Sequence, residues 1–262
     1  MPNAVTNAVD YTGKTVVITG AAQGSGAGIA KRFAEAGADV VITYNRNDIA
    51  AQEKVSEFRK LGSKAAAYHL NQLNTETIDT VIRQIYQDYG RIDCLVNNAG
   101  INPHQNVLDM SGQEWDAMMN SNARGAFFVS QSAAKVMKEQ GGGAIINISS
   151  INATNPSDTL VHYGASKAAV EMITRGLAHS LGKYGIRVNC IAPGLIDAPG
   201  LDKNVPGWRE SYSERAPLGR IATPADMGNV CIFLGSELAS FVTGQVISVD
   251  GGVLLAPCYD WN

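Results

Sequence analysis

The sequence contains no long apolar run and no surplus of basic residues, and each absence argues against a class of protein. No stretch approaches the roughly 18 consecutive apolar residues of a membrane span. Lysine and arginine number 21 against 24 aspartates and glutamates, for a net charge of −3. A nucleic-acid-binding protein usually has a basic surplus. Residues 1–14 lack a basic segment followed by an apolar stretch, so we expect no secretory signal and a cytoplasmic location.

Cysteine and proline are also scarce. The four cysteines are far apart and have no metal-ligand spacing: Cys94, Cys190, Cys231 and Cys258. We interpret them as reduced thiols and expect no metal site. Glycine is more frequent, with 27 residues against nine prolines, mostly at the ends of apolar runs. These glycines mark the ends of helices and strands rather than a linker.

Buried strands and helices alternate along the 262 residues, of which 45% are hydrophobic. Short apolar runs predict seven strands, at 15–19, 40–43, 64–70, 94–97, 145–149, 188–191 and 246–249. Helical spacing predicts helices at 29–36, 49–61, 75–89, 121–139, 163–183 and 224–234. This order indicates one α/β domain over residues 1–262, with a parallel sheet covered by helices on both faces.

Two segments lie outside this alternation. Residues 194–220 have no clear element, and we interpret them as a substrate lid rather than a linker. The tail, 253–262, carries two aromatic residues among its last four. Because a disordered tail rarely needs aromatic residues, we hypothesise that it docks on a neighbouring subunit or lines the edge of its pocket.

A glycine-rich turn follows the first strand directly and precedes a helix. It reads Thr19-Gly-Ala-Ala-Gln-Gly-Ser-Gly26. Glycine lets the backbone approach a phosphate, and a helix start offers free N–H groups and a positive dipole end. The usual G-x-G-x-x-G string is not met, because Ile29 stands at its last glycine. We predict a dinucleotide diphosphate site at Gly20, Gly24 and Gly26; the alternative is a tight turn that needs glycine for packing alone.

The end of the second strand bears on which dinucleotide binds. It reads Thr43-Tyr-Asn-Arg46, with no acid before Asp48. A carboxylate here would bind a ribose 2′-hydroxyl, whereas arginine suits a 2′-phosphate. NADP is therefore favoured, with NAD also used, although Gln23 in the turn supplies no second cation. The alternative for Arg46 is a solvated residue at a helix start.

Tyr163 and Lys167 are four residues apart at the start of a predicted helix, so their side chains share one face. A free tyrosine has a pKa near 10, too high for an efficient base at neutral pH. A unit charge about 4 Å away is worth roughly 3 pKa units at an effective dielectric near 20. Desolvation opposes this effect, so we expect a smaller net fall in the pKa of Tyr163.

Further polar residues come at the same predicted edge of the sheet. Ser150 follows the fifth strand and could hydrogen-bond a reacting oxygen. Asn122 is a candidate partner in a water chain to Lys167, and Asn97-Asn-Ala-Gly100 ends the fourth strand. Tyr-x-x-x-Lys alone is common on exposed helix faces. Together with these residues it becomes specific.

The chain resembles the short-chain dehydrogenase/reductase family of the type with Thr-Gly-x-x-x-Gly-x-Gly, Asn-Asn-Ala-Gly and Tyr-x-x-x-Lys motifs, from about Lys14 to Gly252. The resemblance implies a doubly wound Rossmann-type fold, a homotetramer, and catalysis by Asn122, Ser150, Tyr163 and Lys167, with Tyr163 as acid/base. It also implies NAD(P) contacts from Gly20, Ala22, Gln23, Gly24, Ser25, Gly26, Asn45, Arg46, Asn71, Asn98, Ala99, Gly100, Tyr163, Lys167, Pro193, Gly194 and Ile196. Asn71 stands where many members carry aspartate, and Ala198 where many have threonine.

The substrate is less well indicated. Candidate pocket residues are polar or aromatic, which suits a hydroxyl-rich molecule: Asn102, His104, Ser150, Asn152, Asn155, His162, Trp208 and Tyr212. Val161-His-Tyr163 also resembles the glucose dehydrogenase branch, so we hypothesise a sugar or polyol. The alternative is a keto compound, as in the 3-oxoacyl carrier-protein reductases. A cofactor-binding regulator without catalysis is a third hypothesis, because a fold does not prove activity.

Overall fold

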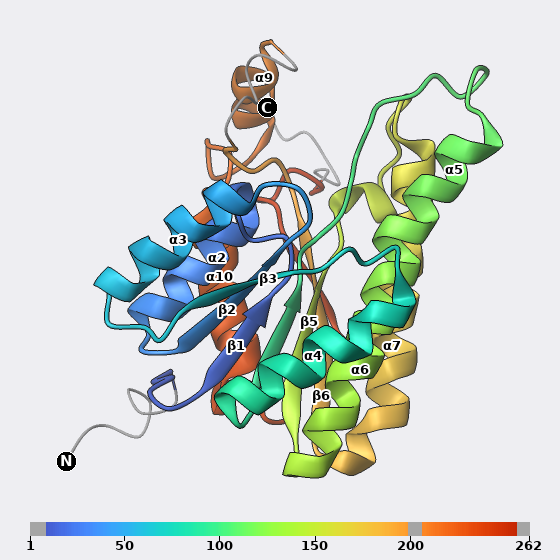
Figure 1. Cartoon of the computed structure of the whole chain (residues 1–262). Helices are drawn as coiled ribbons and strands as arrows, with labels where there is room; N and C mark the ends of the chain where they lie inside the picture. Colours follow the sequence, from blue (N-terminus) through green and yellow to red (C-terminus); the bar gives the residue numbers. More distant parts are fainter. Residues whose placement is uncertain (1–8, 199–205, 256–262) are drawn as a thin grey trace.

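A computed structural model describes residues 9–198 and 206–255 (Figure 1). Within them, seven parallel strands form one sheet in the order β3-β2-β1-β4-β5-β6-β7. Their bounds are β1 Thr15–Ile18, β2 Asp39–Tyr44, β3 Ala66–His69, β4 Cys94–Asn97, β5 Gly143–Ile148, β6 Ile186–Pro193 and β7 Val246–Val249. The predicted doubly wound α/β fold is therefore confirmed.

Helices cover both faces of this sheet, as Figure 1 shows. One layer holds α2 Gly24–Glu35, α3 Asp48–Lys60 and α10 Pro224–Gly235; the other holds α4 Thr75–Tyr89, α6 Gly125–Gln140 and α7 Val161–Leu181. Side chains of β1 alternate between the two layers. Val16 and Ile18 pack with the first, and Val17 packs with the second. The strands are buried on both faces, which is why they appear in the sequence as continuous apolar runs.

Two helices differ from the sequence prediction. The helix expected at 121–139 is preceded by α5, Gly112–Met119, and begins as a π-helix at Asn120–Arg124. A capping box between Ser111 and Glu114 starts α5, but only Met118 of that helix is buried, so it leaves little apolar pattern. Likewise α2 begins at Gly24, five residues before the first apolar residue that indicated it.

The predicted lid contains more structure than the sequence suggested. Ile196 forms a parallel bridge with Ala222, and α9 spans Trp208–Arg215. Figure 1 shows α9 and α5 at the same end of the molecule. Residues 199–205 of this segment lie outside the described residues, as do 256–262, so the hypothesis about the tail is not addressed.

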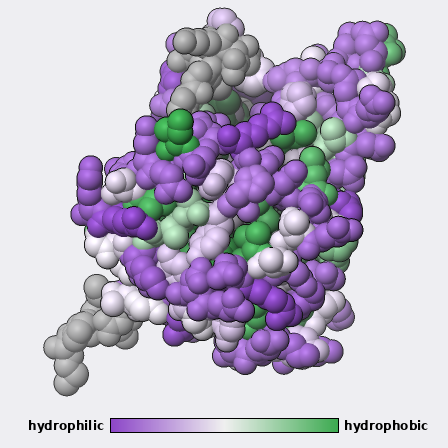
Figure 2. Space-filling view, in the orientation of Figure 1, coloured by the Kyte–Doolittle hydropathy of each residue, from purple (hydrophilic) through white to green (hydrophobic). Residues whose placement is uncertain are grey.

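The outer surface is mainly polar. On the face seen in Figure 2, hydrophobic residues form separate small groups within a hydrophilic surface. No helix of the described residues is sufficiently long and apolar for a membrane crossing. Cys94, Cys190 and Cys231 are buried and free, and Cys258 lies outside the described residues. Among residues 9–198 and 206–255, no three histidine, cysteine or acidic side chains group as metal ligands.

Candidate functional site

The sheet order determines where a ligand can bind. β1 lies at the centre, with β2 continuing on one side and β4 on the other. The segments that leave β1 and β4 therefore turn towards opposite faces of the sheet, which opens a crevice at their carboxyl ends. The glycine-rich turn follows β1, and the Asn98–Gly100 segment follows β4, so both predicted nucleotide-binding segments meet at this crevice.

In the glycine turn, Gly20 and Gly24 have φ values of +65° and +58°, in the left-handed region. A Cβ on Gly26 would come within 2.5 Å of the Asn98 amide nitrogen, so the turn packs tightly against the segment after β4. At the start of α2, Gln23 provides no side-chain cap, and the buried Ser25 hydroxyl has no hydrogen-bond partner. Uncapped N–H groups and a free buried hydroxyl are what an anionic diphosphate needs.

The Asn98 side chain links the segment after β4 to the glycine turn. Its amide nitrogen donates to the carbonyl oxygens of Thr19 and Gly20, at 3.0 and 3.3 Å. The Thr19 hydroxyl accepts from the backbone N–H groups of Asn98 and Ala99. The Asn98 amide nitrogen is thus engaged in joining the two segments.

Arg46 lies exposed at the end of β2 and makes no ion pair within the described part of the chain. Next to it, the Asn47 side chain caps α3 by accepting from the N–H of Ala50 at 3.0 Å. The carbonyl of Asn45 contacts His69 Nε2 at 3.1 Å. Asn71 accepts from the N–H of Leu73 at 3.1 Å. The first acid after β2 is Asp48, two residues beyond Arg46.

Tyr163 and Lys167 converge as predicted. They are one turn apart on α7, and Lys167 Nζ lies 5.6 Å from the centre of the Tyr163 ring. Lys167 is only 5% exposed, and its Nζ donates to the carbonyl of Ile148, at the end of β5, at 2.8 Å. A Cβ on Gly100 would lie 3.6 Å from the same Nζ. The ammonium group is thus held beside the segment that follows β4.

Burial dominates the electrostatics of this pair. It raises the pKa of Tyr163, and a hydrogen bond with the Ser150 side chain opposes that rise. Burial also lowers the pKa of Lys167 to about 8. The expectation that the ammonium would lower the tyrosine pKa is therefore wrong for this structure, because desolvation of the phenolate is the larger effect.

Asn122 lies in the π-helix between α5 and α6. Its amide accepts from the N–H of Ile101 at 2.8 Å and donates to the carbonyl of Ile101 at 2.9 Å and to Ser166 Oγ at 3.0 Å. It therefore fastens the segment after Gly100 to α7. In a π-helix the N–H of Gly125 bonds to Asn120, five residues back, a shift often found at functional sites.

Ser150 lies two residues beyond the end of β5. Its hydroxyl accepts from the N–H of Asn152 at 3.2 Å, and it hydrogen-bonds Tyr163. The neighbouring Ser149 hydroxyl is 3.0 Å from Glu171 Oε1 and 3.2 Å from the carbonyl of Lys167. Successive residues at the end of β5 thus fix α7, and with it the position of Tyr163 and Lys167.

The remaining predicted cofactor residues, Pro193, Gly194 and Ile196, lie at or just after the end of β6. Gly194 donates its N–H to the carbonyl of Val249 at 3.1 Å, and a Cβ on it would overlap the Tyr212 hydroxyl. That hydroxyl donates to the carbonyl of Asp250 at 2.7 Å, which anchors α9 to the end of β7. Tyr212 therefore has a structural partner and does not face a substrate freely.

Two of the candidate substrate residues are in contact, His104 of the segment after β4 and Trp208 of α9. Their ring centres are 6.0 Å apart in an edge-to-face contact, and His104 Nδ1 lies 2.7 Å from Thr159 Oγ1. The segment after β4 thus contacts α9. Asn152 is partly buried next to Ser150, whereas His162 is fully buried.

Sequence reasoning missed a buried polar network behind the site. Asn97 donates to Ser130 Oγ and Asn147 Oδ1, at 2.7 and 2.9 Å, and Asn147 donates to Thr174 Oγ1 at 2.9 Å. This network joins β4 and β5 to α6 and α7. The sequence indicated Asn97 only as the end of a strand. The presence of polar residues within otherwise apolar strands was the signal that could have predicted this network.

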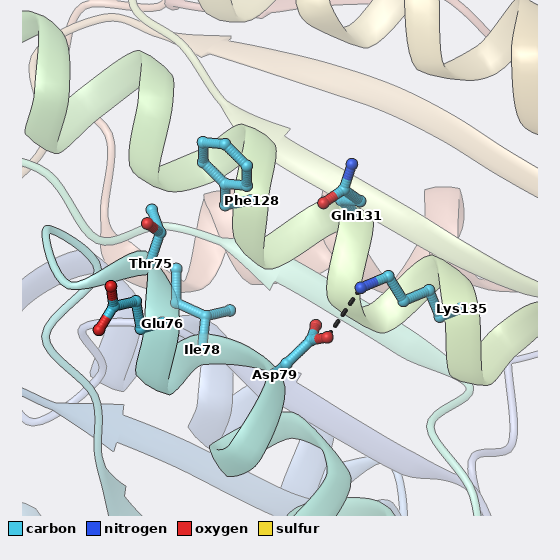
Figure 3. A pocket seen from close by; sticks show the side chains of 7 residues that line it. All are labelled: Thr75, Glu76, Ile78, Asp79, Phe128, Gln131 and Lys135. Carbon is cyan, nitrogen blue, oxygen red and sulfur yellow. Dashed lines mark hydrogen bonds and ion pairs between the residues drawn. The ribbon is translucent and has the colours of Figure 1, made fainter.

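A hollow of about 290 Å³ lies elsewhere, between α4 and α6 (Figure 3). The Lys135–Asp79 ion pair, at 2.7 Å, crosses one side of it. None of the predicted catalytic or cofactor residues lines it.

Comparisons with known proteins agree with this geometry. A family model described as enoyl-(acyl carrier protein) reductase matches residues 20–254. The 3-oxoacyl-(acyl-carrier-protein) reductase FabG of Thermotoga maritima is 40% identical over 248 residues, covering 93% of this chain and 98% of that protein. The L-rhamnose 1-dehydrogenase (NAD(P)(+)) of a Sphingomonas species is 37% identical, covering 92% and 96%.

Solved structures agree as well. A gluconate 5-dehydrogenase from Burkholderia cenocepacia, in complex with NADP and tartrate, superposes with a TM-score of 0.90 at 32% identity, covering 97% of this chain and 100% of that chain. A 7α-hydroxysteroid dehydrogenase with NADH and 7-oxo glycochenodeoxycholic acid has a TM-score of 0.90 at 35% identity, covering 96% and 98%. The chain belongs to the short-chain dehydrogenase/reductase family, NAD(P)-dependent oxidoreductases that act on CH–OH groups.

Proposed function

We propose that this protein is a sugar or polyol dehydrogenase in which Tyr163 is the acid/base, assisted by Lys167, Ser150 and Asn122. One observation carries the catalytic part of this proposal. The buried Lys167 ammonium is held by the Ile148 carbonyl between the Tyr163 ring and the segment after β4. A buried cation in a nucleotide crevice, next to a phenol, is a functional arrangement rather than an exposed helix face.

A bound nicotinamide would accept or supply a hydride at the carbon of the substrate. In the oxidation, Tyr163 takes the proton of the alcohol hydroxyl as the hydride leaves the carbon. In the reduction, Tyr163 donates that proton to the carbonyl oxygen, and the Ser150 hydroxyl stabilises the same oxygen. Since its pKa is about 8, Lys167 is mostly protonated at pH 7, and the Ser150 hydrogen bond favours the negatively charged form of Tyr163.

The proposed cofactor site uses the glycine turn for the diphosphate and Arg46 for a 2′-phosphate. Ser25 Oγ and the uncapped start of α2 fit a diphosphate. Lys167 Nζ has protons beyond the one donated to Ile148 and fits a ribose hydroxyl. The exposed Arg46 and the lack of an acid before Asp48 favour NADP over NAD.

The proposed substrate class depends on polar residues near Tyr163. Ser150, Asn152 and His104 supply hydrogen-bonding groups, and Trp208 supplies an apolar edge beside His104. Two related proteins named for sugars or sugar acids support this choice, L-rhamnose 1-dehydrogenase and gluconate 5-dehydrogenase. The second candidate is a 3-oxoacyl reductase, favoured by the 40% identity to FabG.

We also propose a homotetramer in the cytoplasm. Exposed large apolar side chains support assembly: Met172 of α7 is 63% exposed and Trp115 of α5 is 39% exposed. Phe241, five residues before β7, is fully exposed. Exposed large apolar side chains on a single chain often lie at subunit contacts.

The test is an absorbance screen at 340 nm with NADP and NAD against sugars, polyols and 3-oxoacyl thioesters. We expect turnover with a sugar or polyol, and faster turnover with NADP than with NAD. Turnover confined to 3-oxoacyl thioesters would replace the proposed substrate with the second candidate. Tight binding of NADPH with no turnover on any of these compounds would favour the regulator.

A further inference from the structure

His162, the residue before Tyr163, is buried without any hydrogen bond. Its exposed fraction is 0%, and neither Nδ1 nor Nε2 has a partner. Within the described residues, it is the one side chain for which both ring nitrogens are buried and unpaired. A neutral imidazole always presents one donor and one acceptor, so this position costs free energy. An unpaired buried polar group in a native structure requires an explanation.

The residues around His162 connect α7 to the segment 101–111, which we name the substrate loop. His104 Nδ1 of this loop lies 2.7 Å from Thr159 Oγ1, and the N–H of Gln105 donates to the carbonyl of Thr159 at 2.9 Å. Thr159 stands three residues before His162. The Gln105 side chain also bonds Glu114 of α5, the helix that packs against α7. His162 is thus buried where the loop, α5 and α7 meet.

Two titratable groups face His162 from these elements. The Glu114 carboxylate on α5 favours the charged imidazolium, and His104 on the loop disfavours it. Glu114 already accepts three hydrogen bonds, from the N–H and hydroxyl of Ser111, both at 2.8 Å, and from Gln105. Burial is the largest effect and lowers the pKa of His162 below its ordinary value. Protonation therefore favours a state in which His162 reaches water.

We propose that His162 is an acid-sensitive switch for the substrate loop: when it is protonated, it leaves its buried position, and the loop and α5 separate from the start of α7. A buried imidazolium needs two acceptors, whereas three of the roughly four acceptor sites of the Glu114 carboxylate are filled. This proposal concerns regulation of the proposed active site and rests on that function for its consequence alone.

The consequence follows from what the loop carries. The loop begins at Ile101, which is bonded to Asn122, and its His104 contacts Trp208 of α9. Separation of the loop would break the contact of His104 with Trp208 of α9. The enzyme would then bind substrate more weakly at acid pH, while the nucleotide crevice, built on β1 and β4, stays intact.

The test is hydrogen exchange of the unliganded protein at pH 7.5 and pH 5.5, which needs no turnover. In the wild type, we expect the protection factors of residues 101–111, after correction for intrinsic rates, to fall at pH 5.5 by up to about tenfold, the limit for one imidazole with an ordinary pKa in the open state. His162→Asn has no titrating group, so its protection factors should not depend on pH. His162→Gln repeats the test if the asparagine variant folds poorly, and His179→Asn, exposed on the same helix, is the matched control.

Unchanged protection of 101–111 in the wild type between the two pH values would overturn the proposal. The same acid-induced fall in His162→Asn or His162→Gln would also overturn it, as would a fall abolished by His104→Asn alone. Because exchange is measured without substrate, failure of the switch is distinct from failure of the proposed dehydrogenase activity.

Discussion

Burial sets the protonation of the two central residues. The phenol of Tyr163 and the ammonium of Lys167 both lose hydration, so the neutral form of each is favoured relative to water. At about 8, the pKa of Lys167 still leaves the ammonium charged at neutral pH. The hydrogen bond to Ser150 is the remaining influence that lowers the pKa of Tyr163. Burial of the Lys167 ammonium therefore costs folding free energy at pH 7, whereas Tyr163 is neutral there in both the folded and the unfolded state.

Lys167→Met should stabilise the protein and abolish turnover. The pKa falls from 10.5 in an unfolded chain to about 8, so burial of the charge costs about 3 kcal/mol at pH 7. Loss of the bond to Ile148 offsets about 1 kcal/mol, for a net gain of about 2 kcal/mol or roughly 4–8 °C in Tm. Between pH 8 and 10.5 the folded wild type releases its proton first, so wild-type stability rises and the advantage of the variant shrinks.

Thermal unfolding at pH 7 and pH 10 measures this difference. Lys60→Met, at an exposed position near the end of α3, is the control and should change Tm little. A destabilised Lys167→Met, or a gain that does not depend on pH, would contradict the assignment of burial as the main influence on Lys167.

Arg46→Ala should weaken NADP binding far more than NAD binding. The loss of a charge-assisted contact with a 2′-phosphate is worth about 1.5–3 kcal/mol, or about 10- to 100-fold in Kd. Titration calorimetry with both nucleotides measures the ratio, and Arg83→Ala on the exposed face of α4 is the control. Equal losses for NADP and NAD would mean that Arg46 does not bind the phosphate.

At the scale of elements, the glycine turn needs glycine for two reasons, a left-handed backbone at one position and a lack of space for a side chain at another. Gly24 needs a left-handed backbone in open space, whereas Gly26 needs room beside Asn98 and Ala21. The start of α2 then presents unbonded N–H groups to the crevice. These separate requirements explain why the three glycines are spaced as they are.

Gly26→Ala should lower affinity for the dinucleotide by about tenfold or more, because the added Cβ must displace Asn98 and the turn that would hold the diphosphate. Gly176→Ala on α7 is the matched control, since a Cβ there meets nothing within 4 Å. Fluorescence titration with NADPH measures both variants. An unchanged Kd for Gly26→Ala would show that the turn serves packing alone.

The sequence predicted those elements whose residues carry a local pattern. The β1 run and the Tyr163–Lys167 spacing were sufficient to place both sides of the site. It did not predict α5, because Met118 is its one buried residue, or the π-helix at Asn122, which depends on packing against α7. The hydrogen bond from Lys167 to the Ile148 carbonyl could not be predicted either, because every residue has a backbone acceptor and the sequence does not show which one is used.

At the scale of the whole molecule, the site is assembled from distant parts of the chain. The turn after β1, the loop after β4, the end of β5 and the start of α7 meet because the parallel strands align their carboxyl ends. The polar network from Asn97 to Thr174 ties these strands to α6 and α7. Mutations at its buried positions therefore affect the site through the fold.

Assembly into a tetramer should be measurable directly. Light scattering is expected to give a mass of four 27.8-kDa chains for the wild type. Met172→Glu, which replaces an exposed apolar side chain of α7 with a charged one, should shift the mass to smaller species. Arg175→Ala, at another exposed position of α7, is the control. A monomeric wild type would contradict this prediction.

The most direct test of the whole account is Tyr163→Phe, which removes one hydroxyl from the proposed acid/base and keeps the ring beside Lys167. Turnover is followed at 340 nm with the substrate found in the screen, and NADPH affinity is measured by fluorescence on the same sample. We predict that Kd stays the same while kcat falls about 10²–10⁴-fold. A variant that keeps kcat within about tenfold of the wild type would contradict the role of Tyr163.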